Sequence, residues 1–300
     1  MTIRQITVVG TGLIGGSLAL ALRQRRLVER VVGCDREEIL AEACARNAID
    51  DGFTDAVRAA EGSRIVVLAA PVGQILDLID RLGPCLPPDT LLTDVGSTKA
   101  EIARRARIVF GERAAQRFLP GHPMAGKELS GIEQADGELF RGAVWFLTPL
   151  AGQELTQPLV ADYIHLLEGV GARTVALGAE QHDLLCAWTS HLSQMLSTAL
   201  AATLADFRED FAADFGAEVD LSQVGGRALR ESTRLAASPY HIWRDIALTN
   251  TENIAQAIQR LEQHLAHIRE NLRTPELREE FERARQFKNS HRGTETQRRD

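Results

Sequence analysis

Short apolar runs alternate with helical patterns along the first half of the chain. Ile6–Val9 is a continuous apolar run that predicts a buried strand, and a helical pattern follows over Leu13–Arg23. Strands alternating with helices indicate βαβ units and a mostly parallel, doubly wound sheet. Further strands are predicted at Val31–Asp35, Arg64–Ala69, Leu91–Thr93, Arg117–Leu119, Ala143–Leu147 and Arg173–Leu177, and further helices at Glu37–Arg46 and Thr98–Arg107.

The pattern becomes almost wholly helical after Gly178. Helices with apolar stripes pack on one another or on a second copy of the chain. We therefore expect an α/β domain over residues 1–178 and an all-α domain over 179–288. The polar residues 289–300 predict a disordered tail. The predicted helices of the second half are Gln181–Phe207, Ser222–Leu235, His241–Leu272 and Pro275–Phe287.

Composition narrows the classes of function. The net charge of −7 argues against a general nucleic-acid-binding surface, because phosphate binding needs basic side chains. The four cysteines are scattered without a C-x-x-C pair, which indicates reduced thiols and neither a disulfide framework nor a metal site. No apolar run approaches the roughly 18 residues of a membrane span, and the N-terminus lacks a signal-peptide pattern. We expect a cytoplasmic protein.

A glycine-rich turn joins the first predicted strand to the first helix. Gly10-Thr11-Gly12-Leu13-Ile14-Gly15 has G-x-G-x-x-G spacing, which also occurs in ordinary glycine turns. In a dinucleotide site, Gly10 permits the tight turn, Gly12 lets a pyrophosphate approach, and Gly15 lets helix and strand pack closely. The helix that begins with Leu13 and Ile14 offers free N–H groups to the phosphates.

An acidic residue after the second predicted strand supports the interpretation of the glycine-rich turn as a dinucleotide-binding site. Asp35 follows the glycines by about 20 residues, at the end of the second predicted strand. A carboxylate there accepts hydrogen bonds from ribose hydroxyls and repels a 2′-phosphate. We therefore predict a Rossmann-type domain that binds NAD in preference to NADP. Arg36, the next residue, is the side chain that could instead hold a 2′-phosphate.

Polar candidates follow other predicted strands at the same sheet edge. Pro71 and Ser97 come after the third and fourth strands, so both are expected near the nicotinamide, because ligands bind at the carboxyl ends of parallel strands. Ser97 could equally be the N-cap of the helix beginning at Thr98. His122 lies in the Gly/Pro-rich segment Gly121–Gly126, where it is either a general base or a structural histidine.

The helical half holds polar residues suited to a substrate. His182, Asp183 and Ser190 lie on one predicted helix, where they line either a pocket or a helix contact. Arg230 and Arg234 are four residues apart and share a helix face. Arg234 is therefore either a carboxylate-binding residue or a surface ion-pair partner.

Together these blocks resemble the prephenate and arogenate dehydrogenases of tyrosine biosynthesis. They follow the family's order near its spacings over roughly residues 5–250. The blocks are Val8–Ser17, Asp94–Lys99, Gly121–Gly126 with Glu128 and Gly131, His182-Asp183, Ser190–Leu192, Thr233-Arg234 and Trp243–Ile246.

The resemblance implies a Rossmann domain followed by an all-α dimerisation domain, a homodimer, and NAD-dependent oxidative decarboxylation of prephenate. A hydride leaves the ring carbon bearing the 4-hydroxyl, and the opposite carboxylate leaves as CO₂. By position, His122 matches the histidine that hydrogen-bonds this hydroxyl, and Ser97 matches the serine beside it. Arg234 matches the arginine that binds a substrate carboxylate.

The same resemblance implies further substrate contacts, and here the sequence departs from its relatives. Gln194 stands where several carry a histidine, and Lys127 where many carry a small polar residue. The segment Ser238–Ile242 contains no acid to pair with the ammonium of arogenate, which favours prephenate. Arogenate and 4-amino-4-deoxyprephenate remain alternatives. The expected substrate contacts are Lys127, Ser190, Gln194, Arg234, His241 and Trp243.

Two other classes of protein are alternatives to a prephenate or arogenate dehydrogenase. The β-hydroxyacid dehydrogenases use a helical lysine as acid–base group, and the helical half contains only Lys288. A non-catalytic dinucleotide-binding sensor would need Asp35 and the glycines but neither His122 nor Arg234. NADH formation from prephenate, compared between wild type and His122→Ala, separates an enzyme from a sensor.

Overall fold

The computed structural model describes residues 3–127 and 129–296, with only the backbone described over 291–296. The chain divides into two compact units, Met1–Thr251 and Glu252–Asp300. The predicted boundary at residues 178–179 falls within the first unit, between the last strand and the first helix of the helical part.

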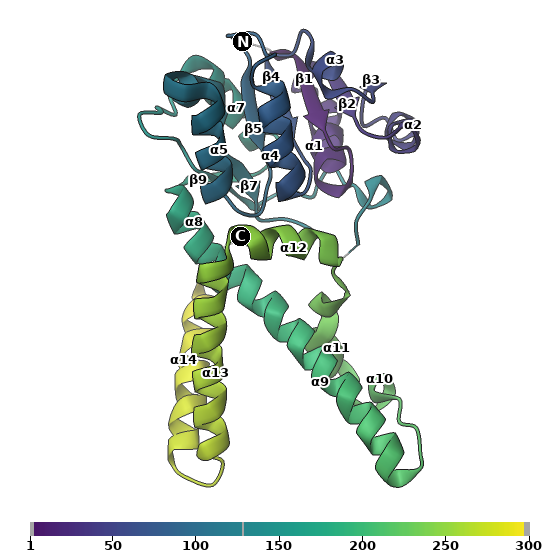
Figure 1. Ribbon diagram of the computed structural model, residues 1–300, viewed down its shortest axis with the longest axis vertical. Coiled ribbons are helices and arrows are strands. Elements are labelled where there is room, and N and C mark those ends of the chain that lie inside the picture. The colour runs from purple at the N-terminus through teal and green to yellow at the C-terminus, as the bar shows by residue number, and fades with distance from the viewer. Residues whose placement is uncertain (1–2, 128, 297–300) are drawn as a thin grey trace. The chain divides into compact units, whose positions relative to one another are not determined.

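The main sheet confirms the predicted doubly wound α/β fold. Every pairing in it is parallel, and the strand order is β3-β2-β1-β4-β5-β6 (Figure 1). The order reverses between β1 and β4, which creates the switch point where such sheets bind ligands. The strands are β1 (Ile3–Val9), β2 (Val28–Cys34), β3 (Asp51–Phe53), β4 (Ile65–Leu68), β5 (Leu91–Asp94) and β6 (Phe118–Leu119).

Helices cover both faces because successive strand residues point to opposite sides. Val8 of β1 packs into the core formed with Leu18 and Leu22, whereas Val9 packs into the core formed with Ile75. One face is covered by α1 (Leu13–Gln24), α2 (Glu37–Ala45) and α7 (Pro158–Gly169). The other is covered by α3 (Ala56–Ala60), α4 (Val72–Leu82) and α5 (Ala100–Phe110).

A second, three-stranded sheet contains the segment with His122. It consists of β7 (Gly121–Pro123), β8 (Val144–Leu147) and β9 (Arg173–Ala176), with β7 antiparallel to β8. The sequence predicted β8 and β9 but not β7, because glycine and proline are poor strand formers. Pairing with β8 compensates for that, and it sets His122 opposite Phe146. A short helix, α6 (Ala114–Arg117), precedes this region.

The long helix predicted over Gln181–Phe207 is interrupted. It consists of α8 (Ala179–Cys186), a π-helical turn at Ala187–His191, and α9 (Leu192–Phe215). The helix predicted over Ser222–Leu235 is likewise divided at a glycine pair into α10 (Leu221–Val224) and α11 (Gly226–Thr233), and a 3₁₀ turn at Arg234–Ala237 follows.

The prediction of one helix over His241–Leu272 was wrong. The chain forms α12 (Tyr240–Thr249) and then α13 (Thr251–Glu270), and the backbone leaves the helical conformation at Asn250, with φ of −136°. Asn250 is buried, and its side-chain amide bonds residues distant in the chain. The break therefore has a tertiary cause that helical periodicity does not reveal.

The second unit contains α13 and α14 (Glu276–Thr296), where His264 of α13 lies 3.9 Å from Glu280 of α14. Our predicted disordered tail overlaps the end of α14, while residues 297–300 lie outside the described part of the chain. Asn, Ser, Gly and Thr are weak helix formers, so local propensity did not predict this extension of α14. No described helix is long and apolar enough to cross a membrane.

Candidate active site

The glycine-rich turn has the geometry that a bound pyrophosphate requires. Gly10 has φ of +94°, and a Cβ there would lie 2.2 Å from the carbonyl oxygen of Ala69. A Cβ on Gly15 would lie 1.9 Å from the carbonyl oxygen of Gly10. A Cβ on Gly12 would meet no atom of the described residues within 4 Å, so this side of the turn is open to a ligand. Two glycines thus shape the turn, and the third leaves it accessible.

Asp35 is fixed beside this turn at the end of β2. Its Oδ2 accepts hydrogen bonds from the backbone N–H of Thr11, at 2.7 Å, and from the Thr11 hydroxyl, at 3.3 Å. The Arg36 guanidinium is exposed and lies 3.4 Å from Glu38. The open glycine turn and the adjacent carboxylate fit the diphosphate and ribose of NAD, which these residues would hold.

A cleft of about 530 Å³ opens where the glycine turn, the ends of β4 and β5, β7 and α12 converge. Several predicted cofactor and substrate residues therefore share one cleft. They are Gly12, Leu13, Ile14, Pro71, Ser97, His122, Lys127, Ser190, His241 and Trp243.

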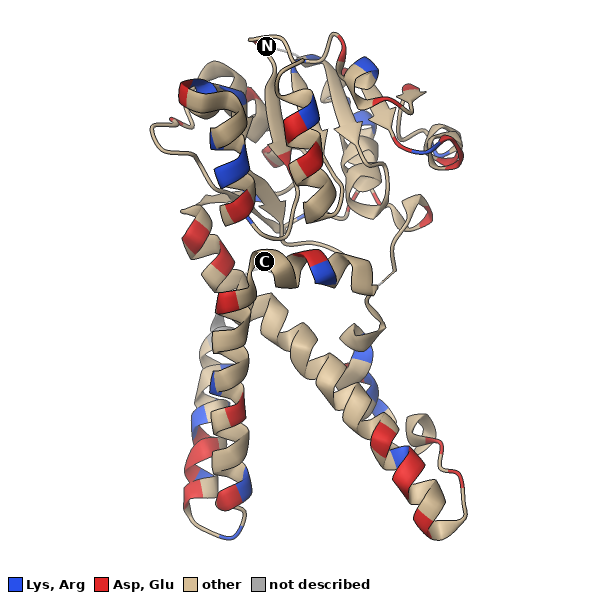
Figure 2. Cartoon of the chain, viewed as in Figure 1, with Lys and Arg blue, Asp and Glu red and all other residues tan. Residues whose placement is uncertain are grey.

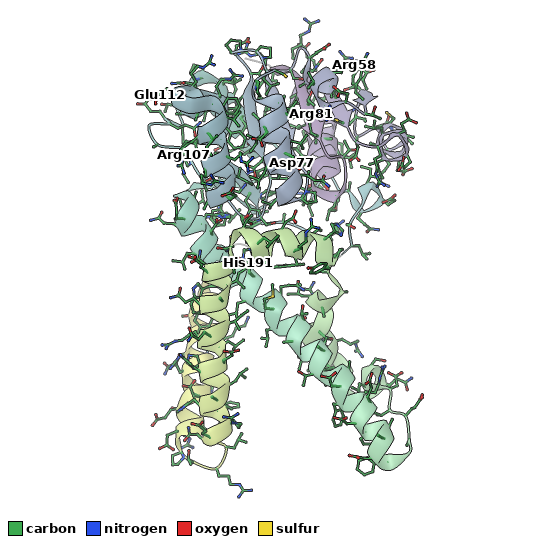
Figure 3. The ribbon with its side chains drawn as sticks, viewed as in Figure 1. Arg58, Asp77, Arg81, Arg107, Glu112 and His191 are labelled. Atoms are coloured by element: carbon green, nitrogen blue, oxygen red, sulfur yellow. The ribbon has the colours of Figure 1, made fainter. Side chains whose placement is uncertain are left out.

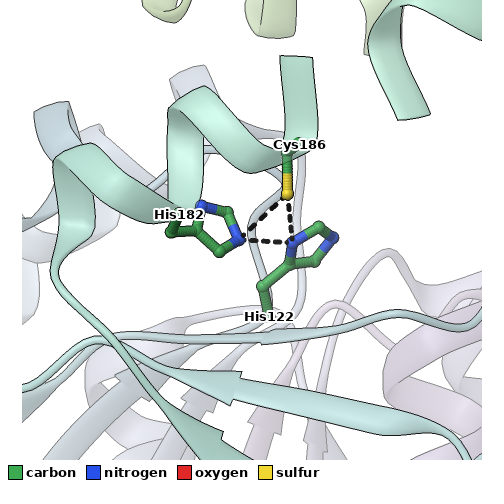
Figure 4. Close-up of side chains that lie close together, drawn as sticks. All are labelled: His122, His182 and Cys186. Atoms are coloured by element: carbon green, nitrogen blue, oxygen red, sulfur yellow. Dashed lines mark hydrogen bonds between the residues drawn. The ribbon is translucent and has the colours of Figure 1, made fainter. Parts of the chain in front are cut away.

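His122 joins a buried polar cluster on α8 (Figure 4). Its Nδ1 lies 2.8 Å from Nε2 of His182, and Nδ1 of His182 lies 2.8 Å from Oδ1 of Asp183. The Cys186 Sγ lies 3.4 Å from His182 Nε2 and 4.0 Å from His122 Nδ1. Desolvation, reinforced by His182, Lys99 and a further histidine, holds the pKa of His122 well below its usual range. His122 is therefore neutral near pH 7 and able to accept a proton.

The donor atoms of His122, His182 and Cys186 all lie within 4.8 Å of one another. Two nitrogen ligands of a tetrahedral zinc ion would stand about 3.3 Å apart, given metal–nitrogen distances of about 2.0–2.1 Å. The nitrogens here are 2.8 Å apart, which is a hydrogen-bond distance. Burial also raises the pKa of the Cys186 thiol to about 12. The geometry is that of a hydrogen-bonded chain.

A buried ion pair anchors the strand that carries His122. Lys99 Nζ donates to Asp94 and, at 2.8 Å, to the carbonyl oxygen of Gly121. Asp94 in turn accepts the backbone N–H groups of Gly96, at 2.8 Å, and Gly121, at 3.2 Å. The end of β5 is thereby tied to the start of β7, which places His122 in the cleft.

The alternative role considered for Ser97, that of an N-cap, is not what the structure shows. The helix begins two residues later than predicted, at Ala100, and no side chain of its own segment caps it. Asp183 caps it from α8, accepting the N–H groups of Lys99 at 2.7 Å and Ala100 at 2.9 Å. Ser97 therefore remains available to the cleft, which it lines.

His191 also lines the cleft, although the sequence analysis did not predict it as a site residue. Figure 3 labels it at the π-helical turn that precedes α9. The Asn250 amide nitrogen donates to the carbonyl oxygen of Asp183, at 2.8 Å, and lies 3.2 Å from His191 Nδ1. A nitrogen that faces a carbonyl is a donor, so His191 Nδ1 is the acceptor. Burial lowers the pKa of His191 to about 4, so the neutral ring carries its hydrogen on Nε2. Its position within the Ser190–Leu192 block was the available signal.

The remaining predicted substrate residues differ in placement. Lys127 lines the cleft, but its ammonium donates to the carbonyl oxygen of Gln134 at 2.9 Å. Gln194 is buried and donates to the carbonyl oxygen of Leu235 at 2.8 Å, so it is not among the described lining residues. Arg230 and Arg234 are exposed and do not line the cleft either.

A parallel sheet with an open glycine turn at its switch point, an acid beside that turn and a neutral histidine in the cleft define a dinucleotide-dependent dehydrogenase. Comparison with known proteins specifies the kind of dehydrogenase. The model of the prephenate dehydrogenase nucleotide-binding domain matches residues 18–176, and that of the prephenate dehydrogenase dimerization domain matches residues 178–287. The chain belongs to the prephenate dehydrogenase family.

Individual relatives agree with this assignment. Prephenate dehydrogenase of Lactococcus lactis is 32% identical over 88% of this chain and 70% of its own length. That of Bacillus subtilis is 32% identical over 83% of this chain and 65% of its own length, so the chain spans about two thirds of these relatives. The Aquifex aeolicus prephenate dehydrogenase, solved with hydroxyphenyl propionate and NAD⁺, has a TM-score of 0.82 at 28% identity and covers 99% of both chains. Synechocystis arogenate dehydrogenase has a TM-score of 0.75 at 28% identity over 96% of this chain and 99% of its own.

Proposed function

We propose that the protein catalyses the NAD-dependent oxidative decarboxylation of prephenate to 4-hydroxyphenylpyruvate and CO₂, with His122 as the base. The observation that carries the proposal is the neutral His122 in a cleft that also contains the glycine turn. A base is needed because removal of the 4-hydroxyl proton as the hydride leaves avoids a protonated carbonyl.

The cofactor and the residues that line the cleft would have separate roles in the reaction. NAD, when bound, supplies the hydride acceptor. In this proposal His122 takes the proton of the 4-hydroxyl, and Ser97, which lines the cleft after β5, would hydrogen-bond the same hydroxyl. Aromatisation of the ring drives the loss of CO₂. Holding the ring in one orientation between the base and the cofactor contributes further to the rate.

The charge of the cleft favours an anionic substrate without an ammonium group. Among the described residues, the cleft is lined by Lys127 and three histidines but by no Asp or Glu. Prephenate and arogenate both carry two carboxylates, but arogenate would also bring an ammonium that costs several kcal/mol to bury unpaired. Arg234 opens the 3₁₀ turn that leads to cleft residues Ser238 and His241, and we propose it as a carboxylate-binding residue.

Arogenate is the second candidate substrate. The Lys127 ammonium, besides its bond to Gln134, lies 3.8 Å from Asp136, so part of its charge is balanced outside the substrate space. This observation reduces the expected discrimination against an ammonium group.

The test is NADH formation with purified protein and either prephenate or arogenate. We expect prephenate to have the higher kcat/KM, and His122→Asn to lower kcat by about 10²–10⁴-fold while NAD binding is retained. His165→Asn, an exposed histidine on α7, is the matched control and should leave the rate unchanged. Near-normal turnover of His122→Asn would remove His122 from the mechanism, and a tenfold preference for arogenate would overturn the substrate assignment.

We also propose that the chain forms a homodimer through its helical half. Residues Leu192 to Ala205 of α9 include no charged side chain, although much of this stretch is exposed (Figure 2). Leu196, within it, is 45% exposed. An uncharged, exposed helical stretch fits burial against a second copy, and it lies in the segment matched by the dimerization-domain model.

A further inference from the structure

A continuous chain of hydrogen bonds connects a buried carboxylate to the cleft. Asp183 accepts backbone N–H groups on both of its oxygens, from Lys99 and Ala100, at the start of α5. Oδ1 also faces Nδ1 of His182 at 2.8 Å. A carboxylate can only accept a hydrogen bond, so His182 Nδ1 carries a hydrogen and donates it.

The hydrogen on His182 determines where the next one lies. Desolvation lowers the pKa of His182, so its ring is neutral and its Nε2 has a lone pair. That lone pair is 2.8 Å from Nδ1 of His122, which must then supply the hydrogen. A neutral His122 with its hydrogen on Nδ1 has an unprotonated Nε2. Figure 4 shows this second nitrogen pointing away from both His182 and Cys186.

We propose that His182 and Asp183 are positioning residues that hold His122 in the tautomer with hydrogen on Nδ1, so that Nε2 is free to take the substrate's hydroxyl proton. The inference rests on the proposed function, in which His122 is the base. In the opposite tautomer Nε2 would carry a hydrogen and could accept no proton. When the 4-hydroxyl proton moves to Nε2, His122 becomes a cation whose Nδ1–H remains bonded to His182.

Among the described residues, His182 is the nearer hydrogen-bond partner of the His122 ring, at 2.8 Å, and the Cys186 thiol lies farther away, at 4.0 Å. His182 and Asp183 are buried, and the Phe146 ring packs nearly perpendicular to that of His182, with ring centroids 5.4 Å apart. Besides His182, the ionisable groups that act on His122 are Lys99 and His191, and both lower its pKa as His182 does. Cys186 is adjacent but keeps its proton, because burial raises the pKa of its thiol to about 12. Water is therefore poorly placed to replace His182.

Two substitutions at position 182 test the proposal. His182→Leu removes the acceptor with little change in volume, and we expect kcat to fall about 10²-fold with KM for NAD unchanged, as expected when a catalytic histidine is held in the wrong tautomer. His182→Gln restores an oxygen near the Nε2 position, and it should recover most of the lost rate. His165→Leu, which makes the same change at an exposed histidine of α7, is the control and should keep the wild-type rate.

A second measurement reads the tautomer directly. In protein labelled with ¹⁵N-histidine, the His122 resonances can be identified by their loss in His122→Asn, because the chain has only eight histidines. We expect Nδ1–H in wild type and His182→Gln, and a shift toward Nε2–H in His182→Leu. If wild type shows hydrogen on Nε2, the proposal is wrong even if a variant fails to fold.

The two proposals fail in different ways. An active His122→Asn contradicts the role of His122 itself. An inactive His122→Asn together with a His182→Leu variant of wild-type kcat contradicts only the positioning role. A His182→Gln variant as slow as His182→Leu, with both folded by circular dichroism, also counts against it.

Discussion

At the scale of single residues, neighbours decide what each histidine in the cleft can do. His122 and His191 are both neutral, yet their hydrogens lie on different nitrogens. Asp183 determines both hydrogen positions. Its carboxylate accepts the hydrogen on His182 Nδ1, and its backbone carbonyl orients the Asn250 amide. His122 thus presents an acceptor at Nε2, whereas His191 presents a donor there. Asp183, a buried residue of α8, thereby gives these two histidines opposite hydrogen-bonding roles in the cleft.

Cofactor choice belongs to this scale as well. Asp35 is held by Thr11 beside the glycine turn, where its charge would meet a 2′-phosphate. We expect wild type to prefer NAD, and Asp35→Asn to lose most of that preference, since the amide removes the repulsion and one acceptor. The measurement is kcat/KM with NAD and with NADP. Arg36→Ala is the control, and equal use of both cofactors by wild type would point to Arg36 as the phosphate-binding residue.

At the scale of elements, acids from the helical part occupy helix N-termini at the sheet edge. Asp183 caps α5, and Asp245 of α12 accepts the N–H of Gly73 in the first turn of α4, at 2.9 Å. The N-cap residue of α1, by contrast, is Gly12, and no side chain caps this helix. Its free N–H groups remain available to an anion, which is what phosphate binding at a helix N-terminus requires.

The glycine turn offers a matched pair of substitutions. Gly12→Ala places a methyl group in open space, so we expect normal thermal stability but a KM for NAD raised at least tenfold, because the methyl occupies the phosphate's position. Gly15→Ala forces a Cβ to 1.9 Å from a backbone oxygen, so we expect strong destabilisation. Thermal unfolding and NAD titration of both variants check this. A Gly12→Ala protein with unchanged NAD affinity would exclude this turn as the phosphate site.

At the scale of the whole molecule, the proposed dimer accounts for the uncharged part of α9. We expect twice the chain mass by light scattering at micromolar concentration. Leu196→Glu should shift the protein toward monomer, because an unpaired carboxylate is costly to bury at an interface. Ile108→Glu on α5 is the control, since Ile108 is even more exposed, at 63%, but belongs to the sheet part of the chain. A wild-type monomer would contradict the proposal.

Local patterns in the sequence determined the strands β1, β2, β4 and β5, the glycine turn and the acid after β2. These features are readable because burial period, turn glycines and strand ends depend on residues close together in the chain. The Gly/Pro-rich segment identified His122 as a candidate base, and the family resemblance added its role at the 4-hydroxyl. The sequence also placed Ser97, Lys127, His241 and Trp243 in the region of the cleft that they line.

The tertiary structure alone decided how these parts act on one another. The bond between His122 and His182 joins residues 60 positions apart, and the cap that Asp183 provides to Lys99 spans 84. The hydrophobic periodicity of the sequence does not predict such contacts, because they form only when the sheet edge and α8 pack together. The same reason explains why Asn250 ends a helix that its neighbours would continue, and why Gln194 bonds a backbone carbonyl away from the cleft. Sequence specified the chemical groups, and the fold specified which lone pairs and hydrogens face the substrate.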